Sequence, residues 1–399
     1  MKKILVYTEN YQRGGGNQYL VDIINNIPKD FSVDILSNKG GIFKEDFNKI
    51  RIKYTYHEIN ILSIYNLYDK IKTISESKFL LFFSKTMVYF FKYFLFFAFK
   101  KINFKRIEQF IEDENYNLVI CCNGGYPGGL TCLDCVDVAE SKNIKVWLTV
   151  VSMPQTKSVI DFIYKGIFQK VDKLIVNSAK IAEEFLKTRS VAFGRLEVLY
   201  NCLPNDSIDI IPEAQVTYDV TMHEYILGYV GRIEKSKGIF YLLDAFAQLL
   251  PHLPNLKLVM VGSGIDLEFA KTYCITKGIQ EKVEFTGFYA GDISVILKRF
   301  NLFVFPSLWE GLPYSVLEAM ANSRLVVSTN VGGIPEIIED GVNGFLVPAA
   351  NSKLLTEKIK YVLGEFKDYD EVVKNSLNTI KYKFSENSFS KGLKSFFDF

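Results

Sequence analysis

The chain has 399 residues, of which 48% are hydrophobic and 23% are charged. This length and composition allow one or two sizeable hydrophobic cores and exclude an intrinsically disordered protein. Lys and Arg number 47 against 45 Asp and Glu, so the formal net charge is only +2. A balanced charge provides no field that attracts nucleic acid, and any cationic binding site must therefore be local.

The N-terminal residues do not resemble a secretory signal. Two lysines precede the apolar run 4–7, which is too short for the hydrophobic region of a signal peptide. We therefore expect a buried first strand and a cytoplasmic protein.

Six cysteines are too few for a disulfide framework. Cys121, Cys122, Cys132 and Cys135 could be combined into a four-thiolate zinc site. However, adjacent cysteines on a strand point to opposite faces, and free cysteines are common core residues. We therefore expect core cysteines and no metal site.

Short apolar runs alternate with helical segments along the whole chain, which favours parallel sheets covered by helices on both faces. The expected strands are residues 3–7, 32–36, 117–121, 145–150 and 173–176, and then 225–230, 257–261, 282–285, 302–305 and 325–328. The alternation of strands and helices is interrupted in the polar, proline-containing stretch near residue 205, where we place the domain boundary. We predict an α/β protein with two Rossmann-like doubly wound domains facing across a cleft. The domains are expected at 1–205 and 206–380, with a helix at 381–399 that packs back on the first.

Residues 78–101 are rich in phenylalanine and carry lysines at a spacing of seven, including Lys85 and Lys92. On a helix these lysines form one basic stripe against an aromatic face. The favoured interpretation is a helix in the membrane interface, with Phe90, Phe94 and Phe97 in the lipid. A cap over the N-terminal sheet and a membrane-spanning helix are the alternatives.

The strongest motif, at residues 306–321, follows an expected strand. Pro313 suits the start of a helix, which places Glu310 in the preceding loop and Glu318 within the helix. The free amides of Tyr314 and Ser315 would then form an anion site suited to a diphosphate. The simpler alternative is that both glutamates are solvated residues at a helix start.

A second loop, after the strand at 225–230, contains Gly231, Arg232 and Lys237. A guanidinium and an ammonium beside a strand end can neutralise the charge that develops on a pyrophosphate leaving group. Either residue could instead be an ordinary surface cation.

These motifs resemble the family 4 retaining glycosyltransferases of GT-B fold. Glu310 and Glu318 match the Glu-x7-Glu motif of that family, and the loop from Gly231 to Gly238 matches its Gly-Arg…Lys-Gly loop. The segments 261–264, 283–287 and 332–347 also resemble the family. In the first half, Gly15 and Gly16 lie where the family has a glycine loop. The alternative is that these glycines form only a flexible turn.

The resemblance implies that Arg232 and Lys237 hold the donor diphosphate, that Glu310 contacts the donor sugar and that Glu318 binds the ribose. It also implies that the remaining donor contacts come from Gly15, Gly16, Gly231, Gly311, Leu312, Tyr314 and Ser315. No metal or cofactor is expected beyond a nucleotide diphosphate sugar, with a UDP-sugar favoured. A histidine frequent in the family after the strand at 145–150 is replaced here by the stretch containing Ser152.

The predicted function is transfer of a sugar, with retention, to a saccharide or lipid-linked saccharide in bacterial lipopolysaccharide, capsule or exopolysaccharide synthesis. The expected location is the cytoplasm, with peripheral contact to the anionic inner leaflet of the inner membrane and no nucleic acid partner. Two alternatives remain open. One is a sugar-nucleotide 2-epimerase or phosphorylase of the same fold. The other is a catalytically silent partner subunit, suggested by the absent histidine.

Overall fold

A computed structural model describes residues 2–11, 14–41, 43–63, 78–112, 114–155, 159–209, 225–364 and 366–397. Within these ranges the side chains of residues 43, 45, 78–93, 123 and 209 lie outside the description. The chain forms two compact units. Unit 1 contains Met1–Val176 and Ala182–Val198, and unit 2 contains Asn177–Ile181 and Leu199–Phe399.

Unit 1 is built on a parallel sheet whose seven described strands run in the order β3-β2-β1-β4-β5-β6-β7. The strands are β1 (Lys2–Thr8), β2 (Phe31–Asn38), β3 (Thr55–Ile59), β4 (Leu118–Asn123), β5 (Lys145–Val150), β6 (Lys173–Val176) and β7 (Leu196–Val198). The five strands expected in this half are confirmed as β1, β2, β4, β5 and β6. The two that were not expected, β3 and β7, are the edge strands, which are less buried than the central strands.

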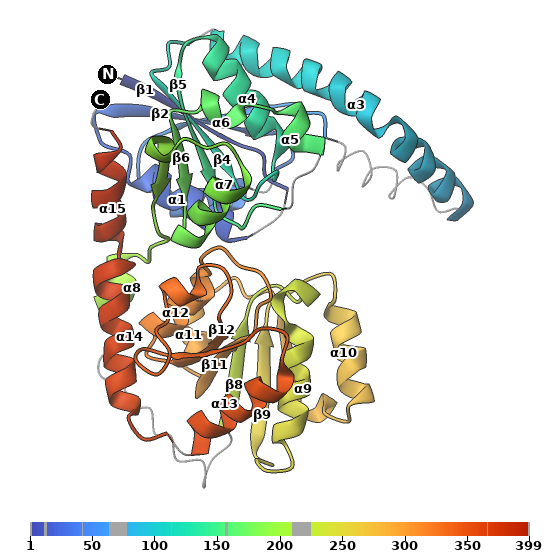
Figure 1. The fold of residues 1–399 in the computed structure, drawn as a ribbon, viewed down its shortest axis with the longest axis vertical. Helices are drawn as coiled ribbons and strands as arrows, with labels where there is room; N and C mark the ends of the chain where they lie inside the picture. The colour runs from blue at the N-terminus through green and yellow to red at the C-terminus, as the bar shows by residue number, and fades with distance from the viewer. Residues whose placement is uncertain are drawn as a thin grey trace. The chain divides into compact units, whose positions relative to one another are not determined.

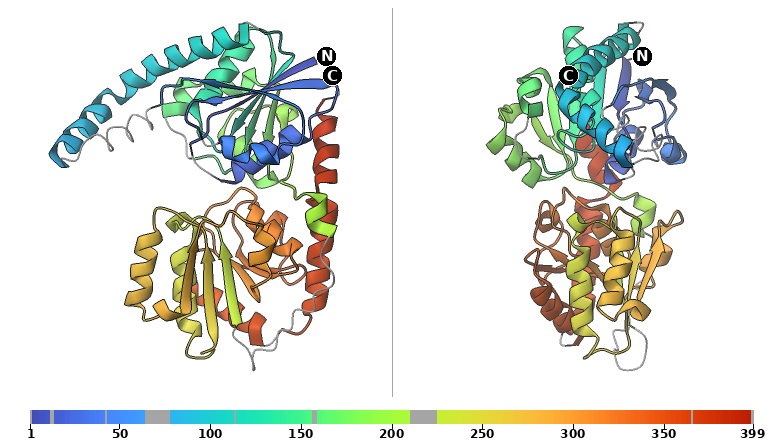
Figure 2. Two further views of the ribbon diagram at one scale, coloured as in Figure 1. Left: turned by 180° about the vertical axis from the view of Figure 1, so that it is seen from behind. Right: turned by 90° about the vertical axis from the view of Figure 1, so that its right-hand side faces the viewer.

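Helices cover both faces of this sheet, with α1 on one face and α4 and α6 on the other (Figures 1 and 2). The helical segments of unit 1 are α1 (Gly15–Asn25), η1 (Phe43–Lys49), α3 (Lys78–Glu112), α4 (Leu130–Ser141), α5 (Val159–Ile163), α6 (Ile167–Lys170), α7 (Ala179–Thr188) and η2 (Phe193–Arg195). The first residues of α7 cluster with unit 2. Strand, helix and parallel strand therefore follow one another as the alternation predicted.

Unit 2 has a parallel sheet whose six described strands run in the order β10-β9-β8-β11-β12-β13. The strands are β8 (Tyr225–Val230), β9 (Leu256–Val261), β10 (Val283–Gly287), β11 (Leu302–Phe305), β12 (Leu325–Thr329) and β13 (Phe345–Val347). The order reverses between β8 and β11, which pair through Leu227 with Leu302 and Gly228 with Phe303. In doubly wound folds, ligands bind outside the carboxyl ends of the strands at such a reversal.

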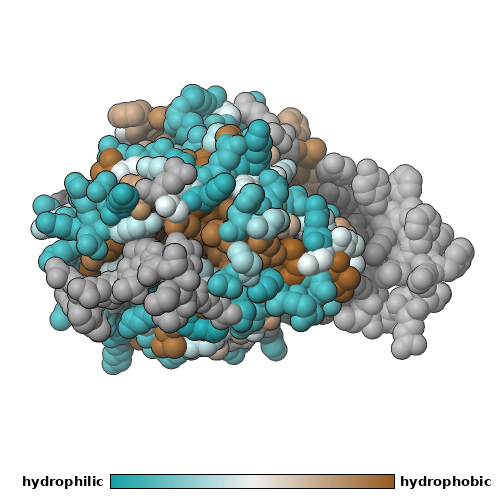
Figure 3. Space-filling model, turned by 90° about the horizontal axis from the view of Figure 1, so that it is seen from below, coloured by the Kyte–Doolittle hydropathy of each residue, from teal (hydrophilic) through white to brown (hydrophobic). Residues whose placement is uncertain are grey.

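One face of the unit 2 sheet carries α9 and α13, which pack together, and the other carries α11, α12 and α14. The helical segments are α8 (Asn205–Asp209), η3 (Lys235–Lys237), α9 (Ile239–Leu249), α10 (Leu267–Thr276), η4 (Gln280–Lys282), α11 (Ile293–Leu297), α12 (Tyr314–Ala321), η5 (Ile334–Glu336), α13 (Ser352–Gly364), α14 (Tyr369–Lys383) and α15 (Glu386–Ser395). The end of unit 2 at which its strands begin is covered mainly by hydrophilic side chains (Figure 3).

The C-terminal helical segment is two helices. α14 and α15 are separated at Ser385, whose side chain accepts from the amide of Ser388 at 3.4 Å. Leu203 is hydrogen-bonded through its backbone to both sides of this break. Its amide donates to the carbonyl of Phe384 at 2.8 Å, and its carbonyl accepts from the amide of Glu386 at 2.9 Å. Both helices cluster with unit 2. The packing of residues 381–399 on the first domain stays a prediction.

The six cysteines are buried and free. Burial raises the pKa of Cys121 and Cys132 well above the usual value, and it raises the pKa of Cys122 to about 12. These thiols therefore stay protonated in the core. Among the described residues there is no group of three or more His, Cys, Asp or Glu side chains that could hold a metal ion.

The aromatic segment forms the N-terminal part of α3. Lys85, Phe90 and Lys92 lie outside the described side chains, whereas Phe94 and Phe97 are 72% and 56% exposed. Further along the helix, Ile107 and Ile111 are buried in unit 1. Within the described part of the chain, no helix has the length and apolar character needed to cross a membrane.

Candidate functional site

Two loops follow the carboxyl ends of β8 and β11, on either side of the point where the strand order reverses. The amide of Leu308 donates to the carbonyl of Ser236 at 3.0 Å, so the two loops are joined through their backbones. Gly238 makes this approach possible. Its φ is +67°, and a Cβ there would lie 1.8 Å from Pro306 O. Only glycine fits such a position without strain.

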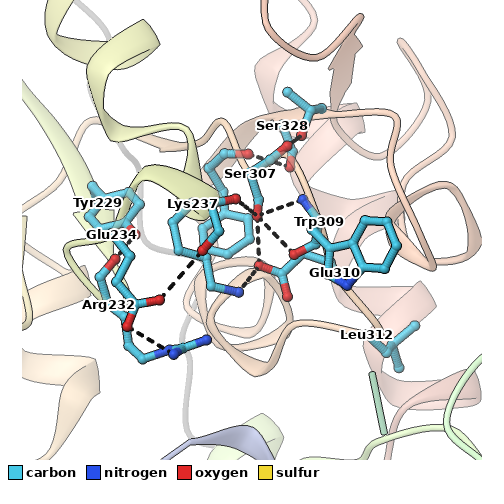
Figure 4. A network of polar contacts seen from close by, with 12 residues as sticks. Tyr229, Arg232, Glu234, Lys237, Ser307, Trp309, Glu310, Leu312 and Ser328 are labelled. Carbon is cyan, nitrogen blue, oxygen red and sulfur yellow. Dashed lines mark hydrogen bonds and ion pairs between the residues drawn. The ribbon is translucent and has the colours of Figure 1, made fainter. Parts of the chain in front are cut away.

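The two loops bring Lys237 and Glu310 together, as Figure 4 shows. Lys237 Nζ lies 2.6 Å from Glu310 Oε1, and the side chains are only 14% and 10% exposed. The hydroxyl of Ser307, which is fully buried, donates to the same Oε1 at 2.9 Å. Glu310 is therefore held by one charged and one neutral donor, in a partly dehydrated setting where such bonds are strong.

Arg232 lies on the more exposed side of this network (Figure 4). Its side chain is 47% exposed, and its Nη1 lies 2.9 Å from Glu234 Oε1. The carbonyl of Arg232 accepts a bond of 2.8 Å from the hydroxyl of Tyr229. Burial, aided by the nearby Glu310 carboxylate, holds the pKa of Tyr229 well above its usual value. The phenol therefore remains a donor and fixes the backbone under Arg232.

Helix α12 begins at Tyr314, with Pro313 as its N-cap and no side-chain hydrogen bond to the cap. Glu310 thus lies in the loop before the helix and Glu318 lies within it, as predicted. Tyr314, Ser315 and Glu318 are all half-buried. The helix N-terminus offers backbone amides to an anion beside the two cations of the site.

The loop that carries Glu310 is also tied to its neighbours by backbone contacts. The amide of Gly333 donates to Gly311 O at 2.7 Å, and Asn201 Nδ2 donates to Leu312 O at 2.5 Å. Gly332 has a φ of +55°, and a Cβ there would lie 2.0 Å from Glu310 O. Gly311 and Leu312 therefore act through their backbones in shaping the loop.

Sequence reasoning missed Ser307 and Asn201 as parts of the site. Ser307 lies two residues after the end of β11, a position from which a side chain can reach a strand-end site. Asn201 is buried, accepts from Asn177 Nδ2 at 3.0 Å and belongs to a stretch that reads only as a linker. The first could have been found from its position, whereas the second carried no such signal.

The glycine loop of unit 1 precedes α1, which begins at Gly15 after the extended residue Gly14. A Cβ at Gly16 would lie 3.2 Å from the Cα of Gly124. The glycine therefore allows the start of α1 to approach the loop after β4 closely. This close approach accounts for a glycine at position 16 within unit 1. The role of Gly16 in donor binding stays a prediction.

The predicted role of Arg232 and Lys237 in holding a diphosphate stays a prediction. Arg232 and Lys237 are each paired with a carboxylate in the structure, so an incoming diphosphate must exchange for, or share, these partners. The exposed Arg232 can leave Glu234 at low cost, because a solvent-exposed ion pair contributes only about 0–1 kcal/mol to the stability of the folded protein. A polyhydroxylated group attached to the anion could then hydrogen-bond to Glu310.

Comparison with known proteins first defines the class. The chain aligns over 99% of its length with 99% of the Anabaena protein HepE solved in complex with UDP, with a TM-score of 0.74 and 18% identity. It also aligns over 99% of its length with 97% of a glycosyltransferase from Rickettsia africae, with a TM-score of 0.74 and 19% identity. The fold is thus GT-B, an α/β fold of two Rossmann-like domains.

Sequence comparison points to one family. Residues 213–379 match the family described as "Glycosyl transferases group 1". An uncharacterized glycosyltransferase of Methanocaldococcus jannaschii is 30% identical over 226 residues, which cover 55% of this chain and 58% of the relative.

A second relative is the Campylobacter jejuni N-acetylgalactosamine-N,N'-diacetylbacillosaminyl-diphospho-undecaprenol 4-alpha-N-acetylgalactosaminyltransferase. It is 27% identical over 207 residues, which cover 52% of this chain and 54% of the relative. The match thus spans little more than half the length of these curated relatives.

Proposed function

We propose that this chain is a family 4 retaining glycosyltransferase that moves a sugar from a nucleotide diphosphate sugar to a hydroxyl of a saccharide or lipid-linked saccharide. The observation that carries the proposal is the network of Lys237, Glu310 and Ser307 beside Arg232 and the N-terminus of α12. The donor belongs to unit 2 and the acceptor to unit 1.

Each residue of the network has a role in this proposal. Arg232, Lys237 and the amides of Tyr314 and Ser315 hold the diphosphate and neutralise the charge that grows as the bond from sugar to phosphate breaks. Glu310 accepts hydrogen bonds from the donor sugar. Glu318 accepts them from the ribose hydroxyls, with Gly231 and the glycine loop of Gly15 and Gly16 giving backbone access to the donor.

A UDP-sugar is the favoured donor, bound without a metal ion. HepE has been solved with UDP and with UDP-glucose, and both structures share the fold of this chain. The cations of Arg232 and Lys237 supply positive charge of the kind that a divalent ion supplies in other phosphate sites.

The names of relatives support a role in surface polysaccharide synthesis. The Campylobacter relative acts on a diphospho-undecaprenol acceptor, and a Staphylococcus aureus relative is a capsular polysaccharide biosynthesis glycosyltransferase. We extend this to a lipid-linked acceptor reached at the cytoplasmic face of the inner membrane. The exposed Phe94 and Phe97 of α3 are consistent with peripheral contact to an anionic leaflet.

Calorimetry with UDP, GDP and ADP in the presence of EDTA tests the donor site. We expect UDP to bind, and we expect Lys237→Met to weaken it at least tenfold. The matched control is Lys235→Met, because Lys235 lies two residues earlier, its ammonium lies 5.3 Å from the centre of the Phe269 ring, and its bond to the Asp266 carboxylate is made by the backbone amide, which the substitution keeps. Equal affinities in both variants would contradict the assignment of Lys237.

Product analysis separates the remaining functions. Transfer that requires an added saccharide supports the proposal, and the anomeric configuration of the product tests retention. An altered nucleotide sugar formed without any acceptor would instead indicate an epimerase. Binding of no nucleotide at all would indicate a catalytically silent partner subunit.

Flotation with anionic liposomes tests the membrane contact. We expect the protein to float and the double variant Phe94→Ser, Phe97→Ser to float less. Unchanged flotation of the variant would contradict the role of these phenylalanines.

A further inference from the structure

The chain enters unit 2 at two places. Residues Asn177–Ile181 belong to unit 2 although the residues on both sides of them in sequence belong to unit 1, and the chain enters unit 2 again at Leu199. We call residues 177–181 the first entry segment and residues 199–201 the second. Both segments are connected within unit 2 to residues 306–313, which we call the Glu310 loop.

Glu336, at the end of η5, holds the first entry segment through its carboxylate. Its Oε2 accepts from the amide of Ala179 at 2.7 Å, and its Oε1 accepts from the amide of Lys180 at 2.8 Å. These are the first two amides of α7, and such amides have no partner within their own helix. A carboxylate there is favoured both by charge-assisted hydrogen bonds and by the helix dipole. The start of α7 is therefore fixed to η5 by a charged group.

The same glutamate lies beside the second entry segment. Burial and the neighbouring Glu336 carboxylate raise the pKa of Tyr200 to about 12, so the phenol stays protonated. Lys383 Nζ donates to the backbone carbonyl of Glu336 at 2.9 Å and lies 4.8 Å from the centre of the Tyr200 ring. Glu336 therefore lies where the two entry segments and α14 come together.

A short backbone path connects Glu336 to the Glu310 loop. The amide of Glu336 donates to Gly333 O at 3.0 Å, and the amide of Gly333 donates to Gly311 O at 2.7 Å. A Cβ at Gly333 would lie 2.4 Å from Gly311 O and 2.8 Å from the Cβ of Ser178. The Glu310 loop, η5 and the first entry segment thus meet at a glycine that leaves no room for a side chain.

Two buried asparagines form a second, uncharged path to the same loop. Asn177 Nδ2 donates to Asn201 Oδ1 at 3.0 Å, and Asn201 Nδ2 donates to Leu312 O at 2.5 Å. Both asparagines are 2% exposed. The two entry segments are therefore bonded to each other, and together they hold the loop two residues after Glu310.

Loosening of the Glu310 loop would move the carboxylate that the proposed function places on the donor sugar. A displacement of about 1 Å, even one caused far from the chemistry, can lower a rate about 100-fold. Arg232 and Lys237 come from the other loop of the site, and Arg232 and Leu312 lie on opposite sides of Glu310 in Figure 4. A loosened Glu310 loop should therefore slow sugar transfer more than it weakens diphosphate binding.

We propose that Glu336 is a positioning residue for sugar transfer, which fixes the Glu310 loop by fastening η5 to both entry segments. The inference rests on the proposed function, in which Glu310 contacts the donor sugar. Glu336 acts on the reaction only through Gly333 and Gly311.

Steady-state transfer from a UDP-sugar and calorimetry with UDP, both on the full chain, test this role. Glu336→Gln keeps the size of the side chain, but its single carbonyl oxygen cannot replace both carboxylate oxygens. We expect kcat to fall at least tenfold while the Kd for UDP stays within twofold. The matched control is Glu339→Gln, an exposed position whose backbone amide keeps its bond to Asn343 Oδ1, and its kcat should stay within twofold.

Asn201→Ala tests the uncharged path and decides the question if Glu336→Gln fails to fold. It should also lower kcat at least tenfold with little change in UDP affinity. Its control is Asn205→Ala, which removes an exposed bond to Asn387 Oδ1 and should leave kcat within twofold. Wild-type kcat in both Glu336→Gln and Asn201→Ala would overturn the proposal, as would equal losses of kcat and UDP affinity.

Hydrogen–deuterium exchange of residues 306–313 separates this proposal from the proposed function, because it requires no activity. We expect exchange in this loop to be at least fivefold faster in Glu336→Gln and unchanged in Glu339→Gln. Unchanged exchange in Glu336→Gln would overturn the role of Glu336 even in an active transferase. Faster exchange in a protein that transfers no sugar would support the connection to the loop and contradict the proposed function.

Discussion

Removing the Ser307 hydroxyl should impair the reaction far more than removing a comparable buried hydroxyl nearby. Ser307 Oγ lies 2.9 Å from Glu310 Oε1, whereas Ser328 Oγ donates to the Phe305 carbonyl at 2.7 Å. Both serines are fully buried and lie at the ends of adjacent strands. The pair therefore differs chiefly in whether the acceptor is a charged site residue.

The expected magnitudes follow from the nature of each acceptor. A hydrogen bond to a charged group contributes about 1.5–3 kcal/mol, and one between neutral groups about 0.5–1.5 kcal/mol. If the bond to Glu310 is needed in the transition state, Ser307→Ala should lower kcat about 10- to 150-fold. Ser328→Ala should lower kcat less than about threefold, although both variants lose some stability.

Steady-state transfer from a UDP-sugar measures kcat and KM for each variant, and calorimetry measures UDP affinity. Because the Ser307 hydroxyl bonds to Glu310, which is proposed to hold the donor sugar and not the diphosphate, UDP affinity should change little in either variant. Ser307→Thr keeps a hydroxyl and should restore part of the activity. Equal losses of kcat in Ser307→Ala and Ser328→Ala would refute the positioning role of Ser307.

Three further predictions concern charge, titration and backbone. Arg232→Ala should weaken UDP binding at least tenfold in calorimetry, while Arg299→Ala, which removes a similarly exposed arginine of unit 2, should leave it within twofold. Burial raises the pKa of Asp134 to about 6 from 3.8. The folded state then holds this proton more tightly than the unfolded state, so the stabilisation is present below pH 4 and lost as the pH rises through 6. In urea unfolding, wild type should lose up to about 3 kcal/mol relative to Asp134→Asn across that window, and parallel curves would contradict the shift. Gly238→Ala places a methyl group 1.8 Å from a carbonyl oxygen and should cost about 3 kcal/mol or more. Gly341→Ala shares the positive φ but has open space, so its cost should be about 1–2 kcal/mol, and equal melting temperatures would contradict the clash.

The central strands of both units could be predicted because they are buried on both faces and therefore read as continuous apolar runs. β8 and β11 were predicted with the bounds that the structure has. The edge strand β3 was missed because an edge strand makes fewer buried contacts and its residues are all exposed or half-buried. The break at Ser385 was also missed, since a serine N-cap inside a polar helical pattern is a weak signal without knowledge of its backbone partner at Leu203.

The sequence alone determined the local features of the candidate site: a loop glutamate, a helix glutamate and two cations near strand ends. These follow from short-range patterns, because strand ends, helix starts and glycine loops are encoded within a few neighbouring residues. Tertiary structure decided that Lys237 pairs with Glu310 across 73 positions of sequence, that Ser307 shares the same oxygen, and that Glu336 holds the start of α7. Such pairings depend on which strands lie side by side and which side chains become buried together, and no local pattern in the chain records that.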